Sequence, residues 1–228
     1  MFIGHFGLGF GAKAAARQVS LGTLILACQF ADLLWPNLVL AGVERFDIAP
    51  GNTVVTPLAF THYPWSHSLE SLLIWGVLFA FVYWLLHRGA RGTLLVIAAL
   101  VVSHWFLDVL VHRPDLPLTI AGTQRYGLGL WNSIPATLAV ELSLFAAGVF
   151  IYARTTVARD RCGRFGLWAL VAFLLFVYLG NLFGPPPPSV AAVAWSAQAM
   201  WLLVAWGYWL DRHRRLRAGS GGPVPSAI

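Results

Sequence analysis

The sequence contains six apolar runs, each long enough to cross a lipid bilayer as a helix. A spanning helix needs about 20 apolar residues. The runs lie at residues 19–36, 68–86, 92–112, 133–153, 165–183 and 190–210. A shorter glycine-rich run at 2–12 would form either a seventh span, completed by residues 13–17, or a re-entrant segment. We therefore expect an all-α, polytopic integral membrane helix bundle with six to seven transmembrane helices.

The composition excludes the other broad classes of protein. Hydrophobic residues make up 58% of the 228 residues and charged residues only 11%, whereas soluble domains carry roughly 25% charged residues. Disordered chains are poor in apolar residues, so disorder is excluded as well. We expect one transmembrane helical domain over 1–217, with chemistry-bearing motifs in 1–112 and further helices in 133–210. The Gly-, Ser- and Pro-rich segment 218–228 is predicted to be a disordered tail.

The basic residues predict how the chain is oriented. Twelve of the fifteen Lys and Arg residues fall in four clusters at 13–17, 88–91, 154–164 and 212–217. Joining the apolar runs in order brings these clusters to one side, which the positive-inside rule makes the cytoplasmic side. The C-terminus is then cytoplasmic. Because the net charge of +6 serves orientation, we expect membrane lipid as a partner and no nucleic acid.

Ionisable residues within or beside the apolar runs are the strongest indication of function. A charged Asp near the bilayer centre costs about 2.5–3.5 kcal/mol, so such residues are functional candidates. With a rise of about 1.5 Å per residue, the candidates from five separated stretches lie at similar depth near the outer face. They are His5, Asp32, His62, His67, Glu70, His104 and Asp108.

His104 and Asp108 are four residues apart and therefore share one face of a helix. This spacing allows both to bind one metal ion, or allows the Asp to orient the His. A buried, hydrogen-bonded pair that supports helix packing is the alternative. Glu141 could similarly be a partner of a metal ligand or a packing acid, and we expect His112 to belong to an outer-loop cluster with Arg113 and Asp115.

Taken singly, the remaining candidates have simpler explanations. His5 would be an interfacial histidine, Asp32 a helix-end residue before Trp35-Pro36, and His62 a loop residue. Glu70 would stabilise the N-terminus of its helix. The functional hypothesis therefore depends on their convergence at one depth.

Four short motifs, taken in order, resemble those of the bacterial membrane-bound metal-dependent hydrolases. The motifs are Gly4-His5, Asp32 at the end of an apolar segment, His62 followed by His67-Ser68, and Ser103-His104 followed by Asp108. The resemblance covers about the first 110 residues. It implies a helical protein of the bacterial cytoplasmic membrane, a divalent metal with zinc as the expected ion, and hydrolysis of a lipid or phosphoester.

The resemblance also implies roles for individual residues. It implies that the metal ligands are His5, His67, His104 and Asp108. It also implies that Asp32 is a ligand or base and that His62 lies near the substrate. The chain departs from the family pattern at Ala31-Asp32-Leu33-Leu34-Trp35, which lacks a second acid and a His. This departure counts against a two-metal site.

The sequence predicts a membrane-embedded hydrolase that acts near the outer face through a metal-activated water. Asp32, His62 and Glu70 are its candidate catalytic groups, with Asp32 or Glu70 as proton acceptor. Two alternatives stay open. A transporter would carry polar residues through the inner half of its helices, and a non-catalytic membrane protein would hold a closed structural metal.

Overall fold

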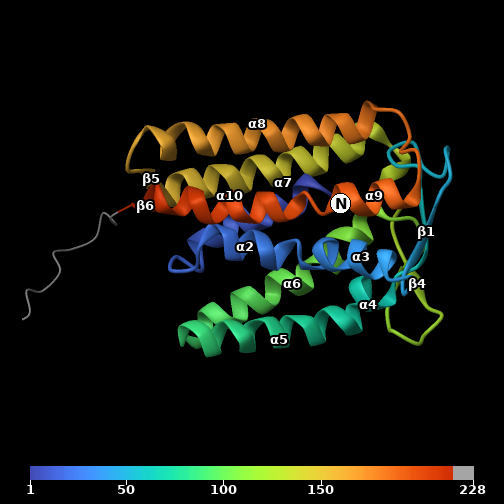
Figure 1. Cartoon of the computed structure of the whole chain (residues 1–228), viewed down its shortest axis with the longest axis horizontal. Helices are drawn as coiled ribbons and strands as arrows, with labels where there is room; N and C mark the ends of the chain where they lie inside the picture. The colour runs from blue at the N-terminus through green and yellow to red at the C-terminus, as the bar shows by residue number, and fades with distance from the viewer. Residues whose placement is uncertain (218–228) are drawn as a thin grey trace, which may run out of the picture.

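The computed structural model describes residues 1–217, which are mainly helical (Figure 1). The predicted tail at 218–228 lies outside the described residues. The helices are α1 (Ile3–Gly11), η1 (Ala12–Ala14), α2 (Leu21–Cys28), α3 (Phe30–Leu40), α4 (Pro64–His67), α5 (Leu69–His87), α6 (Arg91–Val111), η2 (Leu130–Asn132), α7 (Ile134–Thr155), α8 (Arg161–Phe183), α9 (Val190–Ala197) and α10 (Met200–Arg212). Three short antiparallel strand pairs join them: β1 (Arg45–Ile48) with β2 (Leu58–His62), β3 (Leu116–Pro117) with β4 (Arg125–Tyr126), and β5 (Thr156–Ala158) with β6 (Arg214–Leu216).

The long helices lie side by side along the long axis of the molecule (Figure 1). Within residues 1–217, five segments are long and apolar enough to cross a membrane: α5, α6, α7, α8 and the α9–α10 segment. The bent pair α2–α3 is a sixth candidate. At nine residues, α1 is only about 14 Å long against a hydrocarbon core of about 30 Å. It therefore provides no seventh candidate span.

The outward faces of these helices are apolar. Val77, Leu95, Phe176 and Leu202 are between 68% and 74% exposed, although each is a large hydrophobic residue. An apolar surface of this extent is typical of a protein that contacts lipid or another protein.

The predicted helix at 19–36 is broken into α2 and α3, which meet at an angle of 57° at Gln29. In a continuous helix the Cys28 carbonyl would accept the amide hydrogen of Asp32. At the break this carbonyl instead accepts a hydrogen bond from the side chain of His104. The prediction of one uninterrupted helix was wrong because a tertiary hydrogen bond replaces the helical one.

The short helix α1 lies inside the bundle and packs closely against α7. A Cβ atom on Gly148 would overlap the carbonyl oxygen of Gly7, and a Cβ atom on Gly7 would overlap the backbone at Leu144. His5 on α1 is fully buried. The glycines therefore bring the two backbones close enough to hold His5 in the interior.

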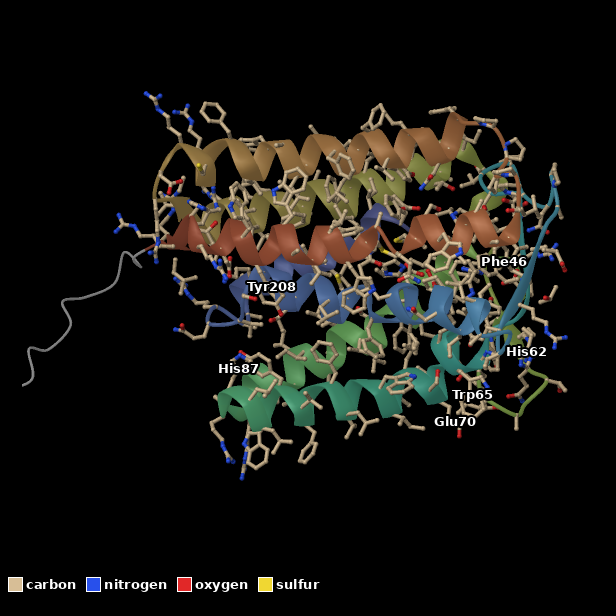
Figure 2. The ribbon with its side chains drawn as sticks, viewed as in Figure 1. Phe46, His62, Trp65, Glu70, His87 and Tyr208 are labelled. Carbon is tan, nitrogen blue, oxygen red and sulfur yellow. The ribbon has the colours of Figure 1, made fainter. Side chains whose placement is uncertain are left out.

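The two ends of the bundle differ in character. One end carries β5 and β6 (Figure 1) together with His87 at the end of α5 (Figure 2). The basic loops also meet there, since Lys13 forms an ion pair with Asp211 at 3.1 Å. His62 and Glu70 lie at the opposite end, beside the β1–β2 hairpin and α4 (Figure 2). The predicted separation of basic and candidate functional residues is therefore present in the fold.

Candidate metal centre

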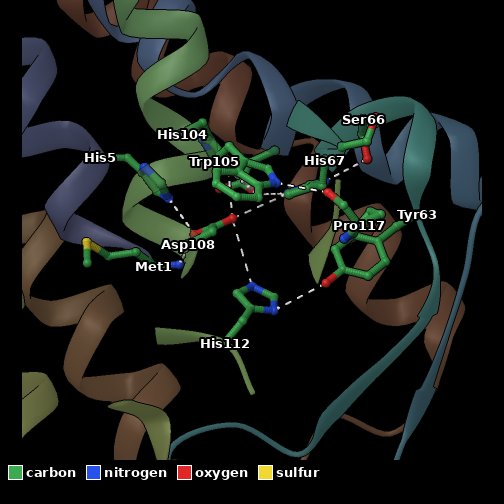
Figure 3. Close-up of polar contacts among 12 residues, drawn as sticks. Met1, His5, Tyr63, Ser66, His67, His104, Trp105, Asp108, His112 and Pro117 are labelled. Atoms are coloured by element: carbon green, nitrogen blue, oxygen red, sulfur yellow. Dashed lines mark hydrogen bonds and ion pairs between the residues drawn. The ribbon is translucent and has the colours of Figure 1, made fainter. Parts of the chain in front are cut away.

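Five of the residues singled out by the sequence meet inside the bundle: His5, Asp32, His67, His104 and Asp108. They come from α1, α3, α4 and α6, so segments that are distant in the sequence build one cluster. Figure 3 shows Asp108 at its middle, with His5 and Met1 on one side and His67 on the other. Two overlapping groups, His5–His104–Asp108 and Asp32–His67–His104, have ligand atoms within 4.8 Å of one another.

The ligand atoms of Asp32, His67 and His104 lie within 4.8 Å of one another, and Asp108 approaches both histidines. Asp32 Oδ1 lies 3.4 Å from His67 Nε2 and 3.7 Å from His104 Nε2. Asp108 Oδ2 lies 3.3 Å from His104 Nε2 and 3.9 Å from His67 Nε2. Metal–ligand bonds of about 2.0–2.2 Å at tetrahedral angles separate ligand atoms by about 3.3–3.6 Å. Asp32, His67 and His104 could therefore hold one ion, with Asp108 next to it.

His104 is oriented by the break between α2 and α3. Its Nδ1 donates a hydrogen bond of 3.0 Å to the Cys28 carbonyl oxygen, which fixes the proton on that nitrogen. The other ring nitrogen, Nε2, is buried and has no hydrogen-bond partner among the described residues. A lone pair left open in the interior is the state that a metal-binding histidine needs.

His67 is oriented by a chain of hydrogen bonds that ends at Glu44. Its Nδ1 donates to Ser66 Oγ at 2.6 Å, and Ser66 Oγ donates to the Glu44 carboxylate, also at 2.6 Å. Glu44 is only 1% exposed and also accepts the backbone N–H groups of Trp65 and Ser66. The relay leaves His67 Nε2 directed at Asp32 and Asp108.

The sequence analysis did not identify Glu44 as a functional residue. It lies in the loop between α3 and β1, 22 residues before Ser66. No helical or strand spacing connects it with the other candidates. Only the folding of that loop against α4 brings the carboxylate to the histidine relay.

His5 contacts Asp108 Oδ1, the carboxylate oxygen that is not the one nearest to His67 and His104. Its Nε2 lies 3.0 Å from Asp108 Oδ1, an oxygen that also accepts from the Met1 amino group. The His5 ring stacks on His104 at 3.7 Å with an interplanar angle of 2°. Both candidate groups need the single open nitrogen of His104, so they describe one centre rather than two.

His112 adjoins the centre. Its Nδ1 donates to Asp115 at 2.9 Å, as expected for the predicted outer-loop cluster, and Arg113 pairs with the same carboxylate. Its Nε2, however, lies 3.8 Å from Asp108 Oδ2.

The structure does not bring His62 or Glu70 into the cluster. His62 is exposed at the end of β2. Glu70 is also exposed, and its carboxylate accepts the backbone N–H of Ile120 at 2.8 Å, which ties α5 to the loop between β3 and β4. Glu141 is buried and accepts the backbone N–H groups of Phe2 and Gly4, so it fixes the start of α1.

A cavity of about 830 Å³ opens from the centre. Asp32, His67, Asp108 and His112 line one part of it, and apolar side chains from α8 and α10 line another. Its volume falls in the range of about 300–1,000 Å³ that is usual for small-molecule sites. The centre is therefore accessible to a ligand of moderate size.

A second group of potential ligands lies at the basic end. Asp160, Cys162 and His213 have ligand atoms within 4.8 Å of one another. Asp160 and Cys162 are exposed, and His213 Nδ1 lies 2.7 Å from Asp160 Oδ2. Hydrogen bonding from His213 lowers the pKa of Asp160.

Comparison with known proteins supplies no relative for this arrangement, since no family model, curated protein or solved structure matches the chain.

Proposed function

We propose that this protein is a membrane-embedded, metal-dependent hydrolase that acts on a lipid or phosphoester substrate. The observation that carries the proposal is the convergence of ligand atoms from Asp32, His67 and His104 within 4.8 Å of one another, beside Asp108 and next to a cavity that Asp32, His67 and Asp108 line. The motif resemblance to bacterial membrane-bound metal-dependent hydrolases supports the same function.

Three features support a position in the cytoplasmic membrane with the centre toward the outer side. Five segments have the length and apolarity of spans, and their outward faces expose large apolar residues. The basic loops gather at the end away from the centre. The positive-inside rule makes that end, and the C-terminus, cytoplasmic.

The residues fit a divalent cation of the zinc type. Imidazole nitrogens and carboxylate oxygens are usual zinc ligands, and the buried open Nε2 of His104 is a ligand atom without another partner among the described residues. A bound metal would lower the pKa of a coordinated water and polarise a phosphoryl or carbonyl oxygen. His104 and His67 are held for this role by Cys28 and by the Ser66–Glu44 relay.

Asp32 is the best-placed proton acceptor. Its side chain is 23% exposed and lines the cavity, whereas that of Asp108 is 2% exposed. A general base must lie within hydrogen-bond reach of the water that it deprotonates. We assign Asp32 to the cavity side of the centre, as ligand or base, and Asp108 to the inner side, where His5 and Met1 hold its second oxygen.

The cavity favours hydrolysis over transport. A transport path would continue polar residues toward the basic end. The part of the cavity that extends from the centre is lined instead by apolar residues such as Phe173, Leu203 and Trp206.

The test of this proposal combines metal content with turnover. We expect the purified protein to contain a divalent metal and to hydrolyse chromogenic phosphodiesters or carboxyl esters. A chelator should abolish this activity and zinc should restore it. Proteoliposome uptake of a solute by protein that shows no hydrolysis would contradict the proposal and support transport.

A further inference from the structure

The cavity at the metal centre has two chemically different parts. The polar part contains Asp32, His67 and Asp108. The apolar part, here called the hydrophobic arm, lies against α8 and α10. Its lining includes Phe173, Val177, Tyr178, Met200, Leu203 and Trp206.

The hydrophobic arm follows α8 over several turns. Along α8 the cavity lining extends from Leu182 to Phe173. Nine residues of helix correspond to about 13–14 Å. The whole cavity, centre included, encloses about 830 Å³. An elongated apolar space beside a polar centre matches a molecule with a hydrocarbon chain and a polar head.

Unpartnered donors in the cavity wall indicate where the polar linkage of such a molecule would lie. Tyr178 is 3% exposed and Trp35 is 6% exposed, and both line the cavity. Neither the Tyr178 hydroxyl nor the Trp35 Nε1 has a hydrogen-bond partner among the described residues. A buried donor without a partner destabilises the fold. A ligand oxygen would remove that cost.

Tyr178 lies at the junction between the arm and the centre. Its ring stacks on Phe2 at 6.5 Å. The backbone N–H of Phe2 is bound by Glu141, and the amino group of the adjacent Met1 contacts Asp108. The Tyr178 ring therefore lies beside the N-terminal segment that contacts Asp108, on the side of the arm toward the polar part.

We propose that the substrate is an amphiphile with a single hydrocarbon chain in the hydrophobic arm, its ester oxygen accepting a hydrogen bond from Tyr178, and its phosphoryl or carboxyl ester group at the metal centre. This inference rests on the proposed hydrolase function and narrows its substrate class. The hydrocarbon chain of the substrate contributes affinity by burying apolar area. Tyr178 is a specificity-determining residue that positions the ester.

Equilibrium binding to the metal-loaded protein in lipid nanodiscs tests the inference, with tritiated dodecyl phosphate and ethyl phosphate as probes. Val177→Trp fills the arm. We expect it to weaken dodecyl phosphate binding about tenfold or more, because buried apolar contact is lost, and to leave ethyl phosphate binding unchanged. Phe176→Trp is the matched control, since Phe176 is 74% exposed on the outer face of the same helix. It should change neither affinity.

Each comparison is made between protein variants with the same probe. The partitioning of that probe into lipid is then the same for all variants and does not affect the ratio of affinities. Leu203→Trp repeats the test from α10 in case the Val177 variant does not fold, and retained ethyl phosphate binding shows that a variant is folded. Tyr178→Phe should weaken both probes about fivefold or more, as expected for loss of one hydrogen bond. Equal dodecyl phosphate affinity in the Val177→Trp, Leu203→Trp and Phe176→Trp proteins would overturn the inference.

The same measurements separate this inference from the proposed function. One outcome is that Val177→Trp abolishes dodecyl phosphate binding while the unaltered protein shows no metal-dependent turnover. That outcome would support the proposed occupant of the hydrophobic arm and contradict the proposed hydrolase function. Metal-dependent hydrolysis of short esters together with binding that is indifferent to Val177→Trp would contradict the arm alone.

Discussion

The two ends of the bundle each bring His and Asp side chains together, but in opposite environments. At the candidate centre, His104 and Asp108 are each 1% exposed. At the basic end, Asp160 and Cys162 are exposed and lie in a segment that also contains Arg159, Arg161 and Arg164. At each end three such side chains have ligand atoms within 4.8 Å of one another, so proximity alone does not distinguish the two ends.

The difference lies in what surrounds the ligand atoms. At the candidate centre, the second nitrogens of His104 and His67 are bound by other groups, and the facing nitrogens converge. At the basic end, solvent screens the Asp160–His213 pair, and neighbouring arginines oppose a cation. A buried polar group needs a hydrogen-bond partner or a ligand, because burial without one is costly. Exposed side chains can hydrogen-bond to water instead, so their positions are less constrained. This comparison predicts different responses to substitution at the two ends.

The largest expected effect is loss of the metal. His104→Ala combined with Asp108→Ala removes the histidine that both candidate groups share and the carboxylate beside it. It should abolish bound divalent metal, measured by elemental analysis of the purified protein. Cys162→Ala combined with His213→Ala is the control at the basic end and should retain full occupancy. Unchanged zinc in the first variant, or loss in the second, would reverse the assignment of the two ends.

The next effect concerns the relay that only the buried end has. Glu44→Gln leaves the ligands intact but weakens the hydrogen bonds that orient Ser66 and His67. We expect metal affinity to fall by about 10–100-fold, measured by competition with a chromogenic chelator. Glu70→Gln replaces an exposed carboxylate outside the cluster and should leave affinity unchanged. Equal affinities in the two variants would show that the relay does not support the centre.

A smaller effect should follow from loosening the contact between α1 and α7. Gly148→Val would push the Gly7 backbone away and displace His5 from Asp108. We expect the free energy of unfolding to fall by about 1–3 kcal/mol, as for other overpacked interiors, measured by thermal unfolding in detergent. Gly92→Ala is the control, because a Cβ atom there meets open space. A Gly148→Val protein as stable as the Gly92→Ala protein would mean that the close contact is not required.

The smallest effect is expected at the basic end and depends on pH. The pKa of Asp160 is lowered by its hydrogen bond with His213. Its contribution to stability is therefore present above the unfolded-state value of about 3.9 and is lost as the pH falls through the lower folded-state value.

Asp160→Asn tests this linkage while retaining a helix-capping side chain at α8. The melting temperature of the variant should lie slightly below that of the unaltered protein at about pH 6 and converge with it as the pH falls below about 4. A difference that is constant over this range would show that the Asp160 charge adds nothing to folding.

Parts of the candidate site could be predicted from local spacing. His104 and Asp108 are four residues apart on α6, and this spacing is set by helix geometry whatever the rest of the fold does. Depth estimates also placed His5, Asp32 and His67 near the same level, and the structure brings them together. His62 and Glu70 passed the same depth test but lie outside the cluster, because depth does not specify which way a side chain points.

Other parts depend on contacts between distant segments. The bend at Gln29 accompanies the bond from His104 to Cys28, which joins residues 76 apart in the sequence. Glu44 reaches Ser66 only because its loop folds against α4. The tilt of a helix, the direction of a loop and the space left between α8 and α10 are set by packing, and no periodicity in the chain encodes them.

The sequence by itself determined the apolar helices, the segregation of basic loops and the identity of most of the residues that form the centre, because these follow from residue chemistry and helical period. Tertiary structure alone decided which lone pairs face one another, which carboxylate orients His67, and where an apolar cavity meets the polar cluster. Those properties depend on backbone positions fixed by close contacts such as Gly7 against Gly148, where a single added carbon would move one helix away from the other.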